Sequence, residues 1–288
     1  MNLRSRLSEK LKLSTELDRL ESHLSTSRIE THRKILNSKR GFLRVIEDLH
    51  FEILQSLGAR QGELRGSTIM EIGSGSTPLS LTLPHVISSD LTWSSKLDLQ
   101  LSADYLPVRD GSLDALVGQN VFHHLMHPGG FISDALRSMK QTGSIVLIEP
   151  SHSWLARLVF PHLFKSETYV DDETQAVKSI IRVGQRPDHF PNQALSFLVF
   201  GRLTSQELLE IYPEITSITL RHLPNGARYL LSGGLNFRQV VPTAILELIR
   251  KLERTVIGKK ILSTCSLHWM VTIEVDKSRS EITDGQTN

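Results

Sequence analysis

The chain of 288 residues contains a single cysteine, Cys265, so no internal disulfide can form. A lone cysteine also fits a reducing compartment. Neither charge is in excess, since 33 basic and 31 acidic residues give a formal net charge of +2. This balance argues against a general binder of polyanions and gives no reason to expect nucleic acid as a partner, without excluding a local basic patch. No run of about 18 apolar residues occurs, so no membrane-spanning helix is expected. The N-terminus lacks the continuous apolar core of a secretory signal, and we expect a cytoplasmic protein.

The hydrophobic pattern changes near residue 68. Before this point, residues 3–37 are polar with leucines at partly helical spacings, and residues 40–57 form an amphipathic helix that ends at Gly58. After it, short apolar runs alternate with helical stretches, which predicts a parallel sheet with helices on both faces. We therefore expect a helical extension over residues 1–58, which packs on the domain, on a partner or on a second copy. An α/β domain follows over residues 59–277, and residues 278–288 form a flexible tail.

The individual elements follow from periodicity and from glycine and proline positions. The expected strands are residues 68–72, 85–89, 97–103, 113–119, 144–148, 216–223 and 267–275. The expected helices after the first strand are residues 130–140, 205–211 and a long amphipathic helix over 243–261. Cys265 is expected to be buried in a strand rather than to act as a nucleophile.

A glycine-bearing loop follows the first strand in the stretch TIMEIGSGSTP, residues 68–78. Glycines at 73 and 75 let a ligand lie against the backbone, and residues 76–81 could open a helix whose N–H groups face that ligand. The dinucleotide fingerprint requires a third glycine where Pro78 stands, and the Gly-Lys-Ser/Thr of a phosphate loop is absent. The loop therefore suits a nucleoside-like ligand without a pyrophosphate, and a flexible turn is the alternative reading.

Polar residues follow the next three strands as well. Asp90 ends the second strand, where a carboxylate can accept hydrogen bonds from both ribose hydroxyls. Asp104 ends the third strand beside Tyr105, a pair that can hold and flank a purine ring. Asn120 follows the fourth strand. Each acid alone is more often a turn or cap residue, but their succession at strand ends indicates one ligand site.

These pieces resemble class I S-adenosylmethionine-dependent methyltransferases of the small-molecule type, similar to methyltransferase type 11. The resemblance rests on EIGSGS, VISSD, SADYLPVRDGSLDALVGQNVFHHL and GSIVLIEP, all between residues 68 and 150. It implies a Rossmann-like, mostly parallel seven-stranded sheet whose last pair is antiparallel, with S-adenosyl-L-methionine as cofactor. The chain departs from the family pattern at Ser76, where many members have glycine. It also departs at residues 92–96, where a helix is compressed, and this affects the register of Asp90 and Leu91.

The resemblance also implies the roles of individual residues. Glu71 would face the amino group of the methionine moiety, Asp90 the ribose hydroxyls, and Asp104 the adenine amino group. The complete predicted cofactor site comprises Glu71, Gly73, Ser74, Gly75, Asp90, Leu91, Asp104, Tyr105 and Asn120.

Methyl transfer from a sulfonium is an in-line displacement, in which the protein mainly aligns and desolvates the reactants. A hydroxyl acceptor additionally benefits from a general base. His123 and His124 follow the fourth strand, and one of them can face the cleft because side chains alternate in an extended segment. We favour His124, and the alternative is that both histidines pack at the strand end. No metal site is expected, because the histidine spacing matches no standard ligand motif.

Residues 151–200 and 224–242 are expected to form the acceptor pocket or a lid. In the second segment, Gly233, Gly234, Arg228 and Arg238 could close over an anionic or sugar-like acceptor. The alternatives are ordinary packing for the first segment and a helix-entry turn for the second. The expected function is enzymatic methyl transfer to a small organic or glycan-type acceptor, at oxygen. The alternative is a catalytically inactive methyltransferase-fold binding protein. A nicotinamide-dependent oxidoreductase is disfavoured by Pro78, and a nucleic-acid methyltransferase by the lack of a basic stripe.

Overall fold

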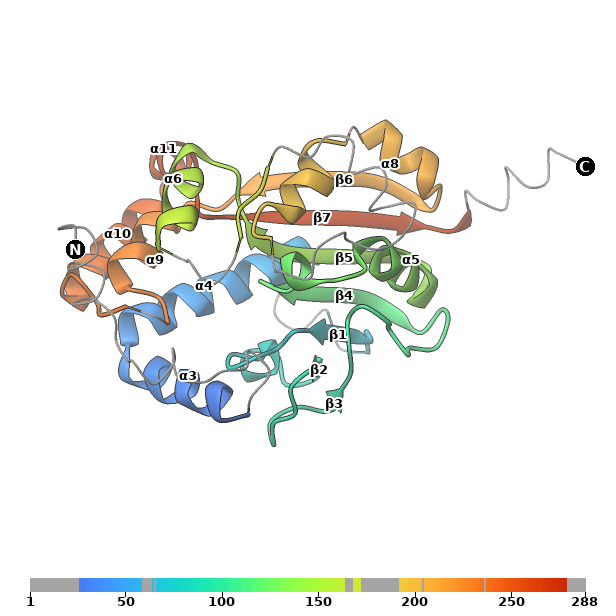
Figure 1. Cartoon of the computed structure of the whole chain (residues 1–288), viewed down its shortest axis with the longest axis horizontal. Coiled ribbons are helices and arrows are strands. Elements are labelled where there is room, and N and C mark those ends of the chain that lie inside the picture. Colours follow the sequence, from blue (N-terminus) through green and yellow to red (C-terminus); the bar gives the residue numbers. More distant parts are fainter. Residues whose placement is uncertain are drawn as a thin grey trace, which may run out of the picture.

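The computed structural model describes residues 26–58, 64, 66–163, 168–171, 192–203, 205–235 and 237–278. A seven-stranded sheet of order β3-β2-β1-β4-β5-β7-β6 forms the centre of the molecule (Figure 1). All neighbouring pairs are parallel except those of β7, which is antiparallel to both β5 and β6. The predicted fold class is therefore confirmed. The strands are β1 (Ile69–Ile72), β2 (Ile87–Asp90), β3 (Leu99–Gln100), β4 (Leu113–Gln119), β5 (Met139–Pro150), β6 (Ile215–His222) and β7 (His268–Asp276).

Two hydrophobic layers cover the two faces of this sheet, because successive strand residues point to opposite sides. In β5, Ile145 and Leu147 join one core cluster, whereas Val146 and Ile148 join the other. The first cluster includes side chains of α5 (Pro128–Ser138), of the π-helical turn Phe197–Gly201 and of α8 (Ser205–Ile211). The second includes side chains of α4 (Arg40–Ser56). The central strands are thus buried on both faces, as a parallel sheet requires.

Helix α4 belongs to the core of the domain rather than to an extension. Its residues Phe42, Val45, Leu49 and Ile53 are at most 2% exposed and pack against the sheet. Of the predicted extension, α3 (Thr26–Ser38) also contributes to this core through Leu36, while residues 1–25 lie outside the described residues.

Helix α3 contacts the loop after β2. Thr26 Oγ1 donates to the carbonyl oxygen of Trp93 at 3.2 Å, and Arg33 donates to Ser94 Oγ at 3.0 Å. The N-terminal helix therefore lies against the same sheet edge as the glycine loop (Figure 1).

The crossovers at this edge are shorter than the sequence suggested. The helix expected over residues 76–81 is a single 3₁₀ turn, Leu79–Leu81, and the expected strand 97–103 pairs only over Leu99–Gln100. Pro78 stands before the turn in extended conformation, and the Leu79 N–H donates to the Glu71 carboxylate at 2.8 Å. The loop is thus closed by a side chain and does not present a helix N-terminus to a ligand.

The long helix predicted over residues 243–261 is also wrong, because it is divided into α10 (Thr243–Glu253) and α11 (Val256–Ser263). Thr255 caps α11 by accepting a hydrogen bond from the Gly258 N–H at 3.0 Å. A Cβ on Gly258 would lie 1.9 Å from the carbonyl oxygen of Leu252, so the two helices meet in a tight turn. Cys265 lies in the turn before β7 and is half-buried, not in a strand. No helix in the described ranges is long and apolar enough to cross a membrane.

Candidate active site

The glycine loop leaves β1 through two residues with positive φ, Gly73 at 63° and Gly75 at 51°. The two glycines serve different needs. A Cβ on Gly73 would lie 2.6 Å from Cγ2 of Val121, so its absence is required by packing. A Cβ on Gly75 would meet only the carbonyl oxygen of Gly73, at 3.8 Å. Gly75 is therefore the position where a ligand can approach the backbone.

Glu71, at the end of β1, holds both ends of this loop by hydrogen bonds. Its side chain is buried, and Oε2 accepts hydrogen bonds from Ser74 Oγ at 2.7 Å and from the Leu79 N–H at 2.8 Å. Burial raises the pKa of Glu71 from 4.5 to about 7. The two hydrogen bonds favour the charged form and lower the pKa, but their effect is smaller than that of burial. The nearby Asp90 carboxylate raises it further. Glu71 thus titrates near neutral pH at the base of the site.

Asp90 ties the end of β2 to the same loop. Its Oδ2 accepts from the Gly75 N–H at 2.9 Å, and its Oδ1 accepts from the Thr92 N–H at 2.7 Å. Ser74 adds a second tie, because its N–H donates to the Ser89 carbonyl oxygen at 2.9 Å. The predicted residues at the ends of β1 and β2 are therefore in direct contact, with Asp90 beside the open position at Gly75.

Asp104 and Tyr105 lie on the loop that follows β3. Asp104 Oδ1 accepts a hydrogen bond from the His127 N–H at 2.7 Å, so this acid holds the start of α5. Tyr105 is 64% exposed, and its ring centroid lies 5.1 Å from that of His127. Leu91, at the end of β2, is 48% exposed. Leu91 and Tyr105 are large side chains that the fold leaves available to flank a planar ligand.

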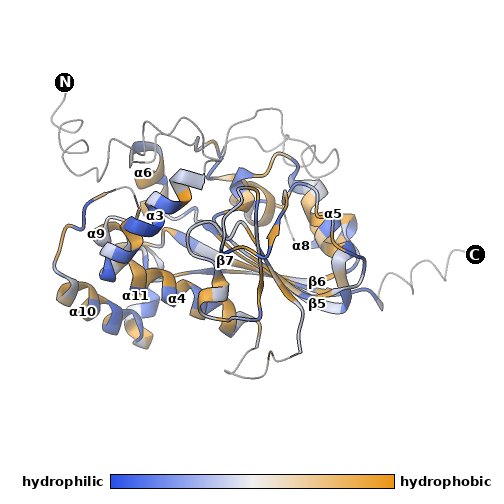
Figure 2. Ribbon diagram, turned by 90° about the horizontal axis from the view of Figure 1, so that it is seen from below, coloured by the Kyte–Doolittle hydropathy of each residue, from blue (hydrophilic) through white to orange (hydrophobic). Residues whose placement is uncertain are grey.

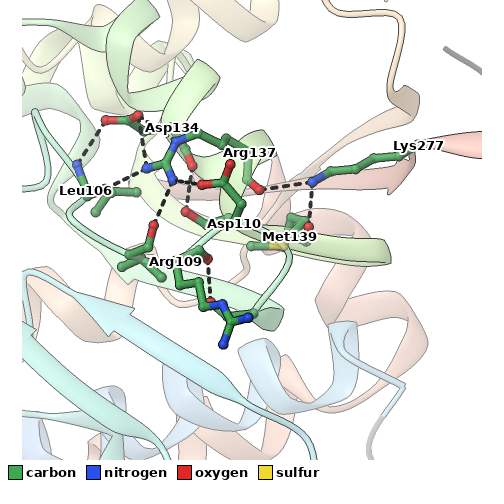
Figure 3. Close-up of polar contacts among 10 residues, drawn as sticks. Leu106, Arg109, Asp110, Asp134, Arg137, Met139 and Lys277 are labelled. Atoms are coloured by element: carbon green, nitrogen blue, oxygen red, sulfur yellow. Dashed lines mark hydrogen bonds and ion pairs between the residues drawn. The ribbon is translucent and has the colours of Figure 1, made fainter. Parts of the chain in front are cut away.

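Arg137 of α5 fixes the conformation of this loop (Figure 3). Its guanidinium donates to the carbonyl oxygens of Leu106 and Val108 at 2.8 and 2.7 Å and pairs with Asp110 and Asp134. Asp134 in turn accepts a hydrogen bond from the Leu106 N–H at 3.0 Å. In the sequence, the only local signal of this network is the i, i+3 spacing of Asp134 and Arg137, so the network was not predicted.

Asn120, directly after β4, has a φ of 53° and is the one non-glycine residue with positive φ in the described part of the chain. Its N–H donates to the Ile148 carbonyl oxygen at 2.8 Å, which holds it in the sheet. Preceding it, Gln119 carries a buried Oε1 with no hydrogen-bond partner. Strained backbone and an unsatisfied polar atom at a strand end are typical of functional sites.

His123 and His124 follow in the 3₁₀ turn Phe122–His124, with their ring centroids 4.2 Å apart. His123 is 3% exposed, and its Nδ1 lies 2.6 Å from Oε2 of Glu149, whereas His124 is exposed. Glu149 is fully buried, and its Oε1 accepts from the N–H groups of Val121 and Phe122 at 2.8 Å each. The carboxylate at the end of β5 therefore anchors the turn that carries both histidines. No sequence pattern predicts this role for Glu149.

The two segments proposed for the acceptor differ in what the structure describes. In the first, His152 precedes α6 (Trp154–Leu163), stacks on Phe197 with ring centroids 3.5 Å apart, and contacts the Tyr169 hydroxyl at 2.8 Å. Burial lowers the pKa of His152 and favours the neutral ring. Residues 164–167 and 172–191 of this segment lie outside the described residues.

In the second segment, Arg228 of α9 (Gly226–Ser232) is not available to close over an acceptor. It is 2% exposed and pairs with Asp48 at 2.7 Å and with Glu253 at 2.6 Å. The turn at Gly233 is held by Lys39, whose ammonium donates to carbonyl oxygens of Ser232, Gly234 and Phe237. A cavity of about 100 Å³ lies between α4, α9 and α10, among these ion pairs and away from the glycine loop.

Among the described residues, no group of three or more His, Cys, Asp or Glu side chains is arranged to hold a metal ion. The gathered groups are instead backbone N–H groups, carboxylates and an amide at the carboxyl ends of β1, β2 and β4. In an open α/β sheet, this is the edge at which ligands bind.

Residues 84–147 match the model of a family described as "Methyltransferase domain". No curated protein sequence matches the chain. Among solved structures, a SAM-dependent methyltransferase of Thermotoga maritima, described as a candidate histamine N-methyltransferase, is 13% identical. Its alignment covers 86% of this chain and 99% of that one with a TM-score of 0.44.

Phosphoethanolamine N-methyltransferase 2 of Haemonchus contortus, solved with phosphomonomethylethanolamine and S-adenosylhomocysteine, is 12% identical. The alignment covers 92% of this chain and 61% of that one, with a TM-score of 0.46. The [4+2]-cyclase SpnF is 12% identical over 80% of each chain, with a TM-score of 0.40. At such identities these likenesses concern the fold alone.

The family match over residues 84–147 and the strand order confirm the predicted resemblance to class I S-adenosylmethionine-dependent methyltransferases. They support S-adenosylmethionine as the cofactor.

Proposed function

We propose that this protein transfers a methyl group from S-adenosylmethionine to a hydroxyl of a small organic or glycan-type acceptor. The observation that carries the proposal is the hydrogen bond from the Gly75 N–H to Asp90, at 2.9 Å. It joins the open glycine position to the acid after β2, so that one ligand can contact both.

The residues present fit this cofactor. Open space at Gly75 permits close backbone approach, and Asp90 retains acceptor lone pairs for ribose hydroxyls beyond its two bonds to N–H groups. Within the described residues, Asp104 accepts a hydrogen bond from His127 through Oδ1 alone, which leaves Oδ2 for an adenine amino group. Asn120 and Glu71 would lie on the methionine side. When bound, S-adenosylmethionine supplies an electrophilic methyl group that needs no further activation.

His124 is the proposed general base. It is exposed, on a turn that the buried Glu149 anchors through the N–H groups of residues 121 and 122. A general base must lie within hydrogen-bond reach of the acceptor proton. The anchored turn fixes the position of the His124 ring and can therefore hold it at that distance. His123 is the second candidate. Its contact with Glu149 at 2.6 Å favours a positioning role, in which the carboxylate orients the ring.

The alternative is a binding protein of the same fold without catalysis. The retained acids at 71, 90 and 104 speak against it only in part, because each of them also makes the local hydrogen bonds described above. Affinity for the cofactor alone therefore does not separate the two functions, and turnover must be measured.

The experiment is to incubate the purified protein with S-adenosylmethionine and matched sets of hydroxyl and amine acceptors, and to quantify S-adenosylhomocysteine. The proposal predicts product with at least one hydroxyl acceptor and its loss in His124→Ala. Product only with amine acceptors would contradict oxygen as the methylated atom. Cofactor binding without turnover across the whole set would favour the binding protein.

A further inference from the structure

Two consecutive helices, α10 and α11, leave an apolar surface uncovered. We define the α10–α11 strip as Ile245, Leu248, Leu252, Val256, Ile257 and Ile261, which are 45, 68, 52, 85, 72 and 60% exposed. Isolated exposed apolar residues are normal, but a contiguous group of large aliphatic side chains marks an interaction site. Figure 2 shows hydrophobic residues along both helices, at the end of the molecule away from the C-terminus.

The strip follows from the periodicity of the two helices. In α10, Ile245, Leu248 and Leu252 are spaced i, i+3, i+7 and share one face. The opposite face carries Leu246 and Glu253, which are 2 and 4% exposed. Helix α10 therefore has apolar side chains on two faces. The face with Leu246 is buried in the domain, and the face with Ile245, Leu248 and Leu252 is exposed.

In α11, Val256, Ile257 and Ile261 are exposed while Gly258 packs on the end of α10. The tight turn at Thr255 separates Leu252 from Val256 by only three residues. The exposed faces of the two helices thus adjoin and form one surface.

The charges around the strip are mostly basic, and the one acid between residues 245 and 261 that is not buried is Glu247, whose side chain is 39% exposed and lies 3.6 Å from Arg250. Between residues 248 and 263, every exposed charged side chain is basic, namely Lys251, Arg254, Lys259 and Lys260. The single acid in this range, Glu253, is buried against Arg228. In the described part of the chain, the three lysines form no ion pair, and Arg254 contacts Asp48 only at 3.5 Å.

We propose that the α10–α11 strip is a docking surface for an anionic lipid bilayer. Aliphatic side chains bordered by lysines on an amphipathic helix are the chemistry that inserts into the boundary between headgroups and acyl chains. Anionic headgroups add attraction for each nearby lysine. A second copy of the chain fits less well, because a two-fold interface would gather the basic residues Lys251, Lys259 and Lys260 of both copies at one contact. Nucleic acid would use the lysines but not six exposed aliphatic residues.

The α10–α11 strip lies at the sheet edge that carries the candidate active site. Strand β6 is antiparallel to β7, which is antiparallel to β5, so β6 runs in the same direction as β5. Helices α9 to α11 follow the carboxyl end of β6 and therefore lie at the same edge of the sheet as Gly75 and Asp90. This inference is independent of the methyl-transfer proposal, because it needs only the exposed surface.

The test is co-sedimentation of the full chain with vesicles of phosphatidylcholine alone and of phosphatidylcholine mixed with phosphatidylglycerol. We expect binding to the mixed vesicles that weakens with added salt, because screening shortens the range of the lysine charges. Lys259→Gln with Lys260→Gln should weaken the partition coefficient roughly ten- to thirtyfold. Leu248→Glu with Ile257→Glu should abolish binding.

The matched control is Leu220→Glu, an exposed apolar position on the edge strand β6, which should bind vesicles like the wild type. Circular dichroism and light scattering on all variants separate lipid binding from misfolding and self-association. No binding to either vesicle would overturn the proposal. So would a dimer in solution that Leu248→Glu with Ile257→Glu dissociates, since the strip would then be a self-association surface.

Discussion

The buried carboxyl group of Glu71 makes a quantitative prediction about stability. Its pKa is raised from 4.5 to about 7, mainly by burial. The folded protein therefore holds this proton more tightly than the unfolded chain, and the free energy of unfolding falls as pH rises from about 4.5 to about 7. Each pKa unit corresponds to about 1.4 kcal/mol, so ionised Glu71 costs the folded state about 3 kcal/mol above pH 7.

The perturbation is Glu71→Gln, which keeps the shape and an oxygen that can accept from Ser74 and Leu79 but removes the titration. Near pH 4, wild type and variant should have similar stability. As pH rises toward 8, the variant should become more stable than the wild type by up to about 3 kcal/mol.

The assay is urea denaturation of both proteins at a series of pH values, with the difference in unfolding free energy plotted against pH. The difference is needed because His50 and His268 titrate in the same range. Burial lowers the pKa of both rings to about 4, so they add stability as pH rises from about 4 to 6.5. These contributions are common to both proteins and cancel. A difference that does not change with pH would refute the assignment of a raised pKa to Glu71.

Three further substitutions test other parts of the structure. Asp90→Ala should weaken S-adenosylmethionine binding at least about tenfold in calorimetry, through lost hydrogen bonds to a charged group, while circular dichroism stays native. Unchanged affinity would remove Asp90 from the site. His124→Ala should lower turnover by about 10²–10⁴ with little effect on cofactor affinity, and normal turnover would exclude it as base. Arg228→Met should cost about 3–5 kcal/mol in denaturant unfolding by leaving Asp48 and Glu253 without their buried partner. A loss below about 1 kcal/mol, the range of exposed pairs, would show that this network is not a buried one.

The sheet could be predicted from the sequence because its signals are local. The bounds of β4 (Leu113–Gln119) and α8 (Ser205–Ile211) agree with the prediction to the residue. A buried parallel strand is a short apolar run between glycine and polar residues. This pattern can be recognised in the local sequence without knowledge of contacts to distant residues. The division of the last long helix also had a visible signal, since Gly258 stands inside a helical pattern, but periodicity alone did not expose it.

Contacts between distant residues could not be predicted. The sequence predicts a place in an acceptor lid for Arg228, yet its partner Asp48 lies 180 residues earlier in the chain. Glu149 is 26 residues from His123, and their contact depends on a 3₁₀ turn that no sequence pattern announced. The strand ends of a parallel sheet come together by topology, which is why acids at 71 and 90 could be expected at one edge. Which of their atoms face a ligand is decided by hydrogen bonds within the loop.

The central claim is that the glycine loop and the acids beside it hold S-adenosylmethionine. Isothermal titration calorimetry of the purified full chain with S-adenosylmethionine, S-adenosylhomocysteine and NAD tests it most directly. The account predicts micromolar binding of the first two ligands and no binding of NAD, because Pro78 and the 3₁₀ turn at Leu79 leave no helix N-terminus for a pyrophosphate. Binding of NAD, or of none of the three, would contradict it.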